Sequence, residues 1–370
     1  MQSIAPVVAA LNTARIVEVY TYGTRESWPV IEELNLPAVR LDELAFATDP
    51  QACLGSMLNT FRPDLVLSGS SPARGHAPET PEQFAILESR RRGVSSVAVL
   101  DYWGMYLERF SRDGQTLADD LLPDHLCVLD HRSWSDLRTL GVPSDLMTIT
   151  HNPWLDLLVA QSSLPQKRFQ ERSTHNITVM LASQPLAEMR HLRNWTYDQY
   201  DLFEQLLRAM EELTGLWTVV TLQVLAHPSE DLALWRTLMA RVEHARVQVE
   251  LCQGNVRERM RQADLLVTSH STLAYEALYF GTPCLSFRPT GQNIMSLWIE
   301  EVGLAPLFQD SETLGHYLKT VNLAKERLRL DMLREELTAA GMFFSDGSAT
   351  ERVVKQVLRI LHKADVKESP

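Results

Sequence analysis

Cysteine is scarce in this chain of 370 residues, which has four, at Cys53, Cys127, Cys252 and Cys284. They are widely spaced and form no CxxC pair, so neither a disulfide framework nor a cysteine-based zinc site is indicated. Cys127 and Cys284 lie in apolar runs that are typical of buried strands. We therefore expect them to be small buried side chains in a reducing compartment.

Long hydrophobic runs are absent as well. No stretch reaches the roughly 18 to 20 apolar residues that are needed to span a bilayer. The first residues, MQSIAPVVAALNTAR, lack a basic region followed by a long apolar run, so we expect no signal peptide. These features predict a cytoplasmic protein, for which a peripheral association with a membrane stays open.

The chain has no surplus of positive charge, because its formal net charge is −12 at pH 7. Proteins that bind nucleic acid usually carry a basic surplus, so no nucleic-acid partner is expected. HExxH, a cluster of His, Asp and Glu, and a DxD motif at a strand end are all missing, and no metal is expected. Walker A and GxGxxG patterns are also missing, which argues against ATP hydrolysis and ordinary NAD binding.

Short apolar runs alternate with amphipathic runs through the first half of the chain. Continuous apolar strands separated by helices predict a parallel sheet covered on both faces, in a doubly wound fold. The expected strands are 15–22, 63–69, 95–101, 125–130 and 146–150. The expected helices are 25–33, 49–60, 80–92, 132–140 and 153–160.

A polar segment, residues 161–176, is rich in Ser, Gln and charge and shows no apolar periodicity. We interpret it as a linker between domains. The strand-helix pattern then restarts. We predict an N-terminal domain over 1–160, a C-terminal domain over 177–345, and a C-terminal helix within 346–370 that packs back onto the first domain.

The first domain begins irregularly. A doubly wound domain opens with a strand and a glycine-containing turn, whereas this chain opens on a helix-like run, SIAPVVAALN. Three explanations stay open: the first strand is missing, it is shifted to 15–22, or it is lost through the choice of start site.

The segment 263–289, ADLLVTSHSTLAYEALYFGTPCLSFRP, is the most informative for function. A strand ends near Ser269 and a helix begins, with Ser271 or Thr272 as its N-cap. The first amides of a helix carry partial positive charge and can bind phosphate. Glu276, one turn further, can accept hydrogen bonds from ribose hydroxyls. The alternative is an ordinary capped helix with a surface glutamate.

Two further strand ends carry polar side chains. His227 follows the expected strand 217–228 and can donate to a phosphate oxygen or stabilise a leaving phosphate. Ser183 and Gln184 follow the first strand of the second domain. Since ligands of open α/β sheets bind at the carboxyl ends of strands, we expect these groups to share one donor site.

Together these motifs resemble the C-terminal domain of glycosyltransferase-B enzymes. The segment is similar to that of lipid-A-disaccharide synthase, the nucleotide-sugar 2-epimerases and the CDP-glycerol glycerophosphotransferase group. These families share an Ala-Asp strand with a Ser/Thr end, a helix that carries Glu, and a G-x-P turn, here Gly281-Thr282-Pro283. The resemblance implies two Rossmann-like domains that face a cleft, with the N-terminal one lacking its first strand in one interpretation. His151-Asn152-Pro153 is similar to the turn that joins the two domains, with His151 in place of the usual Gly.

The first domain should then supply the acceptor site. Asp101 ends a strand and precedes Tyr102 and Trp103, and an acid among aromatic rings suits a sugar-binding cleft. A carboxylate there can remove a proton from an acceptor hydroxyl as a general base. The loop with Arg74 and His76 can contact an anionic ligand. The alternatives are a helix cap at Asp101, aromatic rings in the core, and an exposed loop.

We therefore expect a metal-independent transferase of the glycosyltransferase-B type, without a cofactor, in surface polysaccharide or glycoconjugate biosynthesis. Its donor is a sugar or polyol phosphate linked to UDP or to CMP or CDP, and its acceptor and oligomeric state are left open. His227 and Asp101 are the expected catalytic residues. A nucleotide-sugar 2-epimerase is one alternative, although the turn at 269–272 reads Ser-His-Ser-Thr where those enzymes have a Ser-Gly-Gly element. A non-catalytic relative that binds a ligand or partner is another.

Overall fold

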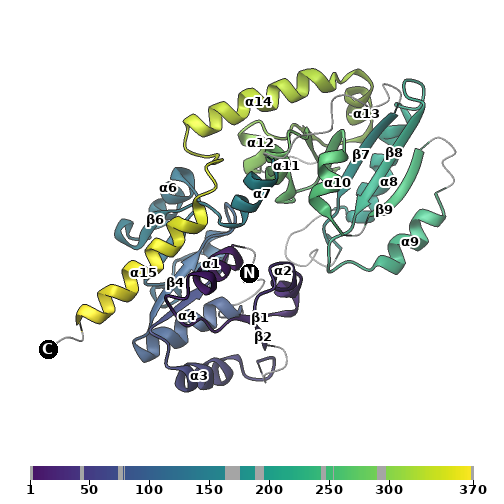
Figure 1. Ribbon diagram of the computed structural model, residues 1–370. Coiled ribbons are helices and arrows are strands. Elements are labelled where there is room, and N and C mark those ends of the chain that lie inside the picture. The colour runs from purple at the N-terminus through teal and green to yellow at the C-terminus, as the bar shows by residue number, and fades with distance from the viewer. Residues whose placement is uncertain are drawn as a thin grey trace. The chain divides into compact units, whose positions relative to one another are not determined.

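The computed structural model describes residues 3–41, 46–73, 78, 80–162, 176–187, 196–242, 247–252, 254–289 and 297–367 (Figure 1). Its contacts divide the chain into two compact units. Unit 1 comprises Met1–Gln161 and Ala340–Pro370, and unit 2 comprises Ser162–Ala339. Most of the expected linker, residues 163–175, lies outside the described residues.

Unit 1 alternates short strands with helices. Its strands are β1 (Tyr22–Gly23), β2 (Val39–Arg40), β3 (Leu65–Ser68), β4 (Ser95–Val99), β5 (His125–Val128) and β6 (Met147–Ile149). Its helices are α1 (Ala5–Ala14), α2 (Trp28–Glu33), α3 (Pro50–Phe61), α4 (Pro81–Arg92), α5 (Tyr106–Phe110), α6 (His131–Thr139), α7 (Trp154–Ser162) and α15 (Ala349–Lys367). The expected strands from 63 to 150 are therefore confirmed, each a few residues shorter than its apolar run.

The main sheet of unit 1 has the order β3-β4-β5-β6, with all pairs parallel, within the described residues. The predicted strand 15–22 is wrong in its extent, because only Tyr22–Gly23 is a strand and it pairs with β2 in a separate small sheet. At the end of this segment the carbonyl oxygen of Thr21 accepts from the amide of Val39 in β2 at 3.0 Å. Residues 16–20 form no strand in the part of the chain that the structure describes.

The C-terminal helix α15 packs on α1, and the two run along the same side of unit 1 in Figure 1, in yellow and purple. Their apolar side chains form one core cluster with β4 and β5. Its buried members are Ile4, Val7, Leu11, Val97, Val99, Cys127, Val353 and Val357. Residues from the two ends of the chain thus complete the interior of unit 1.

Unit 2 repeats the alternation. Its strands are β7 (Asn176–Ala182), β8 (Val219–Leu225), β9 (Val247–Cys252), β10 (Leu265–Thr268), β11 (Cys284–Phe287) and β12 (Leu307–Phe308). Its helices are α8 (Gln199–Glu211), α9 (Leu232–Ala240), α10 (Val256–Gln262), α11 (Leu273–Tyr279), α12 (Trp298–Glu301), α13 (Ser311–Thr320) and α14 (Leu323–Ala339). β10 and β11 are buried at every position, as expected for strands covered on both faces.

The sheet of unit 2 is parallel and has the order β12-β11-β10-β7-β8-β9. The first strand, β7, therefore lies in the middle of the sheet. The chain adds β8 and β9 on one side, and then returns to add β10, β11 and β12 on the other. This is the usual doubly wound order, and it creates a topological switch point between β7 and β10. No helix of the described residues is long and apolar enough to cross a membrane.

Candidate functional site

The switch point of unit 2 is bordered by short polar loops. Ser183 and Gln184 follow β7, and Ser269, Ser271 and Thr272 follow the neighbouring strand β10. The hydroxyl of Thr268, at the end of β10, donates to the carbonyl oxygen of Ala182 at 3.4 Å and accepts from the amide of Ser271 at 3.0 Å. The ends of the two strands are thereby fixed at the position where open α/β sheets bind ligands.

A buried carboxylate connects the β7 and β8 loops. Glu230 is 6% exposed and accepts a hydrogen bond from the Ser183 hydroxyl at 2.7 Å and one from the His227 amide at 2.6 Å. A carboxylate that accepts from an N–H and an O–H forms strong, charge-assisted bonds. Glu230 therefore holds Ser183 and His227 next to each other, as their shared strand-end position predicts.

The His227 ring is exposed, and its Nδ1 atom accepts from its own turn. The Ser229 amide lies 3.2 Å from Nδ1, and the Ser229 hydroxyl lies 2.7 Å from it. An amide can only donate, so Nδ1 carries no hydrogen and the neutral ring bears its hydrogen on Nε2. His227 is thus set up to donate a hydrogen bond from Nε2, which suits an anionic oxygen.

The loop after β10 is partly buried and partly open. Ser269 is buried, and its hydroxyl lies 2.8 Å from that of Tyr197 and 3.1 Å from Nδ1 of His270. Ser271 is buried, and its hydroxyl accepts from the amide of Leu273, the first residue of α11, at 3.3 Å. The N-cap of α11 is Thr272, one of the two predicted caps, which is exposed and makes no side-chain cap bond.

α11 itself has seven residues, fewer than two turns, so its macrodipole is small. Any anion at this loop is held mainly by individual hydroxyl and amide groups. Glu276, one turn into the helix, is buried at 9% exposure. The alternative of a surface glutamate is therefore wrong.

Gln184 offers an acceptor at the same edge. Its side-chain oxygen Oε1 is buried and has no hydrogen-bond partner among the described residues. An unsatisfied buried oxygen costs free energy unless a ligand or water donates to it. A ligand N–H or O–H group at the end of β7 can supply that donor.

The sequence did not predict three residues at the strand ends of unit 2 as site residues: Glu230, Glu300 and Arg288. Glu300 on α12 pairs with Arg288 and accepts from the Ser286 hydroxyl at 2.6 Å, so the end of β11 is held by a second buried carboxylate. The position of Glu230, three residues after His227 and one residue before Asp231, the N-cap of α9, was the available signal. Its partner Ser183 lies 47 residues away in sequence, and spacing alone does not reveal such a pair.

In unit 1, Asp101 forms an ion pair with a buried arginine. The Arg109 atom Nη1 lies 2.7 Å from Oδ1 of Asp101, and the side chains are 1% and 43% exposed. Arg109 also donates to the carbonyl oxygen of Ser70. The amide nitrogen of Asn152 donates to the backbone oxygen of Asp101 at 3.0 Å. Asp101 thus neutralises a buried cation, and its role as a general base stays a prediction.

The aromatic pair beside Asp101 is divided between core and surface. The Trp103 ring is buried, and its Nε1 donates to Oδ2 of Asp130 at 2.7 Å. Asp130 also caps α6 by accepting from the amide of Ser133, and burial raises the pKa of Asp130. Tyr102 is half-buried and lies edge-on to Trp103. Trp103 is therefore part of the core, as the alternative to an acceptor role proposed.

The remaining predicted residues of unit 1, Arg74 and His76, lie outside the described residues. His151, which replaces the glycine of the resembled turn, has a positive φ of 67°. That is the left-handed region which glycine adopts most easily. Its ring is buried against Phe344, and this burial lowers the pKa of His151 to about 3. Within the described chain, no cluster of three or more His, Cys, Asp or Glu side chains is placed to hold a metal ion.

No protein-family model matches the chain, and no curated protein sequence matches it. Solved structures are similar over nearly its full length. A putative UDP-N-acetylglucosamine 2-epimerase from Listeria monocytogenes has a TM-score of 0.65 at 16% identity, covering 98% of this chain and 94% of that one. UDP-GlcNAc 2-epimerase from Neisseria meningitidis, solved with UDP-GlcNAc, has a TM-score of 0.65 at 14% identity, with 97% and 96% covered.

MurG from Acinetobacter baumannii has a TM-score of 0.52 at 12% identity, with 96% of each chain covered. Identities this low establish the fold alone. They agree with the parallel sheets of both units, and they confirm the predicted fold class and the resemblance to nucleotide-sugar 2-epimerases. The chain thus has the glycosyltransferase-B fold, built from two Rossmann-like domains.

Proposed function

We propose that unit 2 binds a UDP-linked sugar at the carboxyl ends of β7, β8 and β10, and that the protein acts on it as a nucleotide-sugar 2-epimerase. The observation that carries this proposal is the switch point between β7 and β10, where hydroxyl, amide and imidazole groups meet at one edge of the sheet. Two similar structures were solved with UDP-GlcNAc and a third with UDP, which supports UDP as the nucleotide.

The side chains of this edge suit a nucleoside diphosphate. Ser271 and Thr272 offer hydroxyl groups to the phosphate oxygens, and His227 offers the hydrogen on Nε2. Glu276 can accept from the ribose hydroxyls. Ser183 and Ser269 hold the neighbouring loops through Glu230 and Tyr197. Gln184 supplies the acceptor Oε1 described above.

The reaction assignment is supported by the similarity to several UDP-GlcNAc 2-epimerases from different organisms. The C2–H bond of such a sugar is not acidic by itself, so the electron pair left by its proton must form a C1=C2 double bond while the C1–O bond to UDP breaks. Return of a proton to the opposite face of C2 and of the UDP oxygen to C1 completes the inversion. One group must accept the proton and another must return a proton. Asp101 remains the candidate base in unit 1, where it pairs with Arg109.

Incubation with UDP-N-acetylglucosamine in D₂O, followed by proton NMR, tests the reaction. We expect signals of the 2-epimer to appear, with deuterium in place of hydrogen at C2, because the returned proton comes from solvent. Titration with UDP in a calorimeter tests the site separately. If UDP does not bind, the proposal is wrong for the site as well as for the reaction.

Transfer of the sugar to an acceptor is a second candidate, which the sequence resemblance favoured and the similarity to MurG supports. It predicts that UDP is released only when an acceptor is present, without deuterium at C2. The same NMR experiment separates the two reactions. A protein that binds UDP and shows neither reaction would fit the non-catalytic alternative.

A further inference from the structure

Helix α14 is the last element of unit 2, and it has one buried face and one exposed face. Leu330, Leu333 and Leu337 are buried. On the same side of the helix, Arg327 forms an ion pair with Asp264. Residues three and four apart share a helix face, so these contacts fix α14 to unit 2 by one side only.

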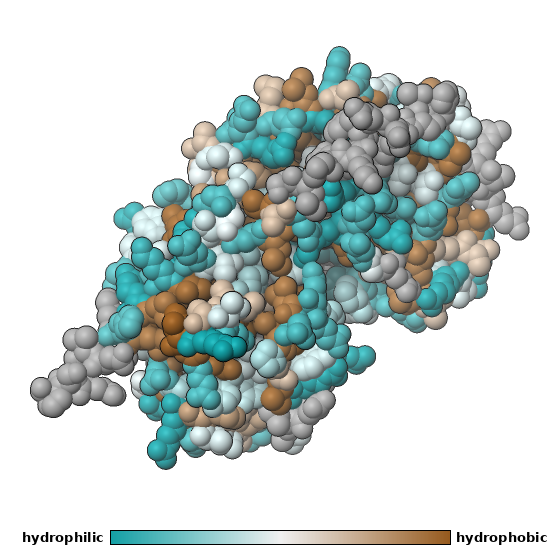
Figure 2. Space-filling view, viewed as in Figure 1, coloured by the Kyte–Doolittle hydropathy of each residue, from teal (hydrophilic) through white to brown (hydrophobic). Residues whose placement is uncertain are grey.

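Two large apolar side chains lie on the exposed face. Leu328 is 61% exposed and Met332 is 55% exposed. Within the described residues, α14 is the one helix that carries two exposed large apolar side chains. Figure 2 shows hydrophobic surface between hydrophilic surface where Figure 1 places α14. Single exposed apolar side chains are normal on a protein surface, so it is their pairing on one helix face that indicates a partner.

Charged side chains of opposite sign flank this apolar pair. Lys325 comes three residues before Leu328, and Glu335 comes three residues after Met332. Both are exposed, and neither side chain forms an ion pair within the described part of the chain. The four positions are three, four and three residues apart, which is the spacing of the contact positions in a coiled coil. We call these four residues the α14 stripe.

The α14 stripe is complementary to itself, because its residues are arranged symmetrically about position 330. When two copies of α14 run antiparallel, Leu328 of each copy lies opposite Met332 of the other. Lys325 of each copy then lies opposite Glu335 of the other. Every contact occurs twice, which is the geometry of an isologous two-fold interface. A parallel arrangement would instead place like charges beside each other.

One acidic side chain lies close to the two-fold axis of such a pair. Asp331 is exposed and is next to the central position 330, so the two copies of this carboxylate approach each other. Arg334 forms an ion pair with Asp331 in each chain. The arginines reduce the repulsion between the two carboxylates, and the antiparallel pairing stays compatible with the charges.

A lipid surface fits the exposed face of α14 less well than a second copy does. Helices that lie on membranes carry mainly Lys and Arg on their polar face, which attract anionic lipids. The exposed positions in the second half of α14 include Asp331, Glu335 and Glu336, and the whole chain has a net charge of −12. Anionic lipids repel such a surface.

We propose that the α14 stripe is a homodimer interface, in which the α14 helices of two copies pack antiparallel. Leu328 and Met332 form its apolar centre, and Lys325 and Glu335 form an ion pair at each end. Two helices of 17 residues bury less surface than the roughly 1,200 to 2,000 Å² of a standard stable interface, so this dimer dissociates on dilution. The proposal is independent of the function proposed for unit 2.

Sedimentation equilibrium of the full chain over about 1 to 300 μM covers the range in which a weak interface dissociates. We expect the mass to rise from 42.0 kDa toward twice that value. Leu328→Glu places a carboxylate in the apolar centre and should raise the dissociation constant at least tenfold. The matched control is Leu234→Glu, at an exposed site on α9 of the same unit, which should leave it unchanged. Equal melting temperatures establish that the variants are folded.

Charge reversal tests the direction and register of the pairing. Lys325→Glu and Glu335→Lys each place like charges opposite each other at both ends, so each variant alone should dimerise about fivefold more weakly or worse. A mixture of the two variants should form a heterodimer, because all opposed charges then differ in sign. The double variant should dimerise like the wild-type protein.

A chain that keeps a mass of 42.0 kDa over the whole concentration range would overturn the proposal. So would a dimer that Leu328→Glu leaves unchanged, because another surface would then hold it together. If the two charge variants associate no better when mixed than alone, the antiparallel pairing of the α14 stripe is wrong.

Discussion

The two units share one folding pattern and use their strand ends differently. In unit 2, Gln184, His227 and Thr272 follow β7, β8 and β10 around a switch point. His227 and Thr272 are exposed, and the side-chain oxygen of Gln184 has no hydrogen-bond partner among the described residues. In unit 1 the ends of β4, β5 and β6 lead to Asp101, Asp130 and His151, and each is engaged in internal packing. A polar residue at a strand end therefore indicates a ligand site only where the topology opens a crevice beside it.

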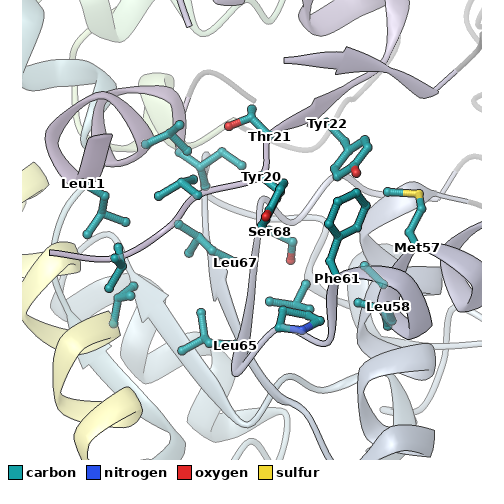
Figure 3. Close-up of a pocket in the computed structure, with 18 of the residues that line it drawn as sticks. Leu11, Tyr20, Thr21, Tyr22, Met57, Leu58, Phe61, Leu65, Leu67 and Ser68 are labelled. Carbon is teal, nitrogen blue, oxygen red and sulfur yellow. The ribbon is translucent and has the colours of Figure 1, made fainter. Parts of the chain in front are cut away.

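The sheets explain this difference. The strand order of unit 2 changes sides at β7, and in open α/β sheets this is the position where neighbouring loops diverge and ligands bind. The order β3-β4-β5-β6 of unit 1 runs in one direction only, and no switch point exists within its described sheet. The position where it would occur lies between the segment 16–21 and β3, both of which line a cavity of about 560 Å³ (Figure 3).

The largest effect is expected from Glu230→Ala, which tests whether the edge of unit 2 is held in place for a ligand. The substitution removes two hydrogen bonds to a buried carboxylate. At about 1.5 kcal/mol for each bond to a charged group, it should lower the free energy of unfolding by about 3 kcal/mol. UDP binding should weaken more than tenfold, because His227 and Ser183 lose their positions.

Urea unfolding and calorimetry with UDP measure these two effects. The matched control is Glu204→Ala, an exposed glutamate on α8 whose ion pair with Arg208 is 3.9 Å long. It should change stability by less than about 0.5 kcal/mol. Unchanged UDP affinity in Glu230→Ala would remove the β8 loop from the proposed site.

The second effect belongs to unit 1 and depends on pH. The pKa of His151 is lowered to about 3 by burial, against about 6.5 in the unfolded chain. Between these two pKa values the unfolded chain binds a proton at His151 and the folded chain does not. The free energy of unfolding is therefore at its full value above pH 6.5 and decreases as the pH falls toward 3. At pH 5 the loss is about 2 kcal/mol.

Denaturant unfolding at pH 7 and pH 5 measures this difference. His151→Gln should reduce it by about 2 kcal/mol, whereas His362→Gln, an exposed histidine on α15, should leave it unchanged. If the wild-type protein and His151→Gln depend on pH to the same extent, the ring is not held neutral in the folded state.

Sequence patterns identified most strands but not their partners. β3 to β8 and β10 to β11 come from continuous apolar runs, which bury on both faces wherever they pair. Residues 16–21 read IVEVYT, in which apolar and other side chains alternate. Residues 16–20 nevertheless form no strand, because pairing depends on a neighbour that no local pattern reveals. The contacts of Glu230 with Ser183 and of Trp103 with Asp130 are long-range, so they emerge only with the fold.

The turn at His151-Asn152-Pro153 differs from these long-range contacts, because the local sequence did indicate its conformation. The resembled families have glycine where this chain has His151, and the positive φ of His151 gives the physical reason for glycine there. The sequence offered no signal that the His151 ring would instead stack on Phe344, because Phe344 comes from the returning C-terminal segment.

The third prediction concerns Asp101 and tests whether its side chain stabilises the fold, takes part in catalysis, or does both. Asp101→Ala removes the anion that pairs with buried Arg109, which keeps its bond to the carbonyl of Ser70. We expect a loss of about 1.5 kcal/mol in the free energy of unfolding. Asp145→Ala, an exposed aspartate of the same unit, is the control and should be neutral.

A purely structural role for Asp101 predicts that any remaining folded protein keeps its full turnover. A general base predicts instead that turnover falls by about 100-fold or more at a temperature where the variant is fully folded. Measuring kcat together with the melting temperature distinguishes the two. His227→Ala, measured in the same way, tests the second catalytic prediction. If neither substitution changes activity, the protein does not use these residues for catalysis.

The smallest effect is expected at the β10 loop, where Ser271→Ala removes one hydroxyl from the edge of the switch point. The hydroxyl accepts from the Leu273 amide at 3.3 Å, and loss of such a bond at a helix start costs about 1 kcal/mol or less in folding stability. If the same hydroxyl also contacts a phosphate oxygen, UDP affinity falls about fivefold, which corresponds to about 1 kcal/mol. Thr237→Ala, on the exposed face of α9, changes neither quantity. A stability loss without any loss of UDP affinity would make Ser271 a support of the helix start only, and the phosphates would then have to be assigned to Thr272 and His227.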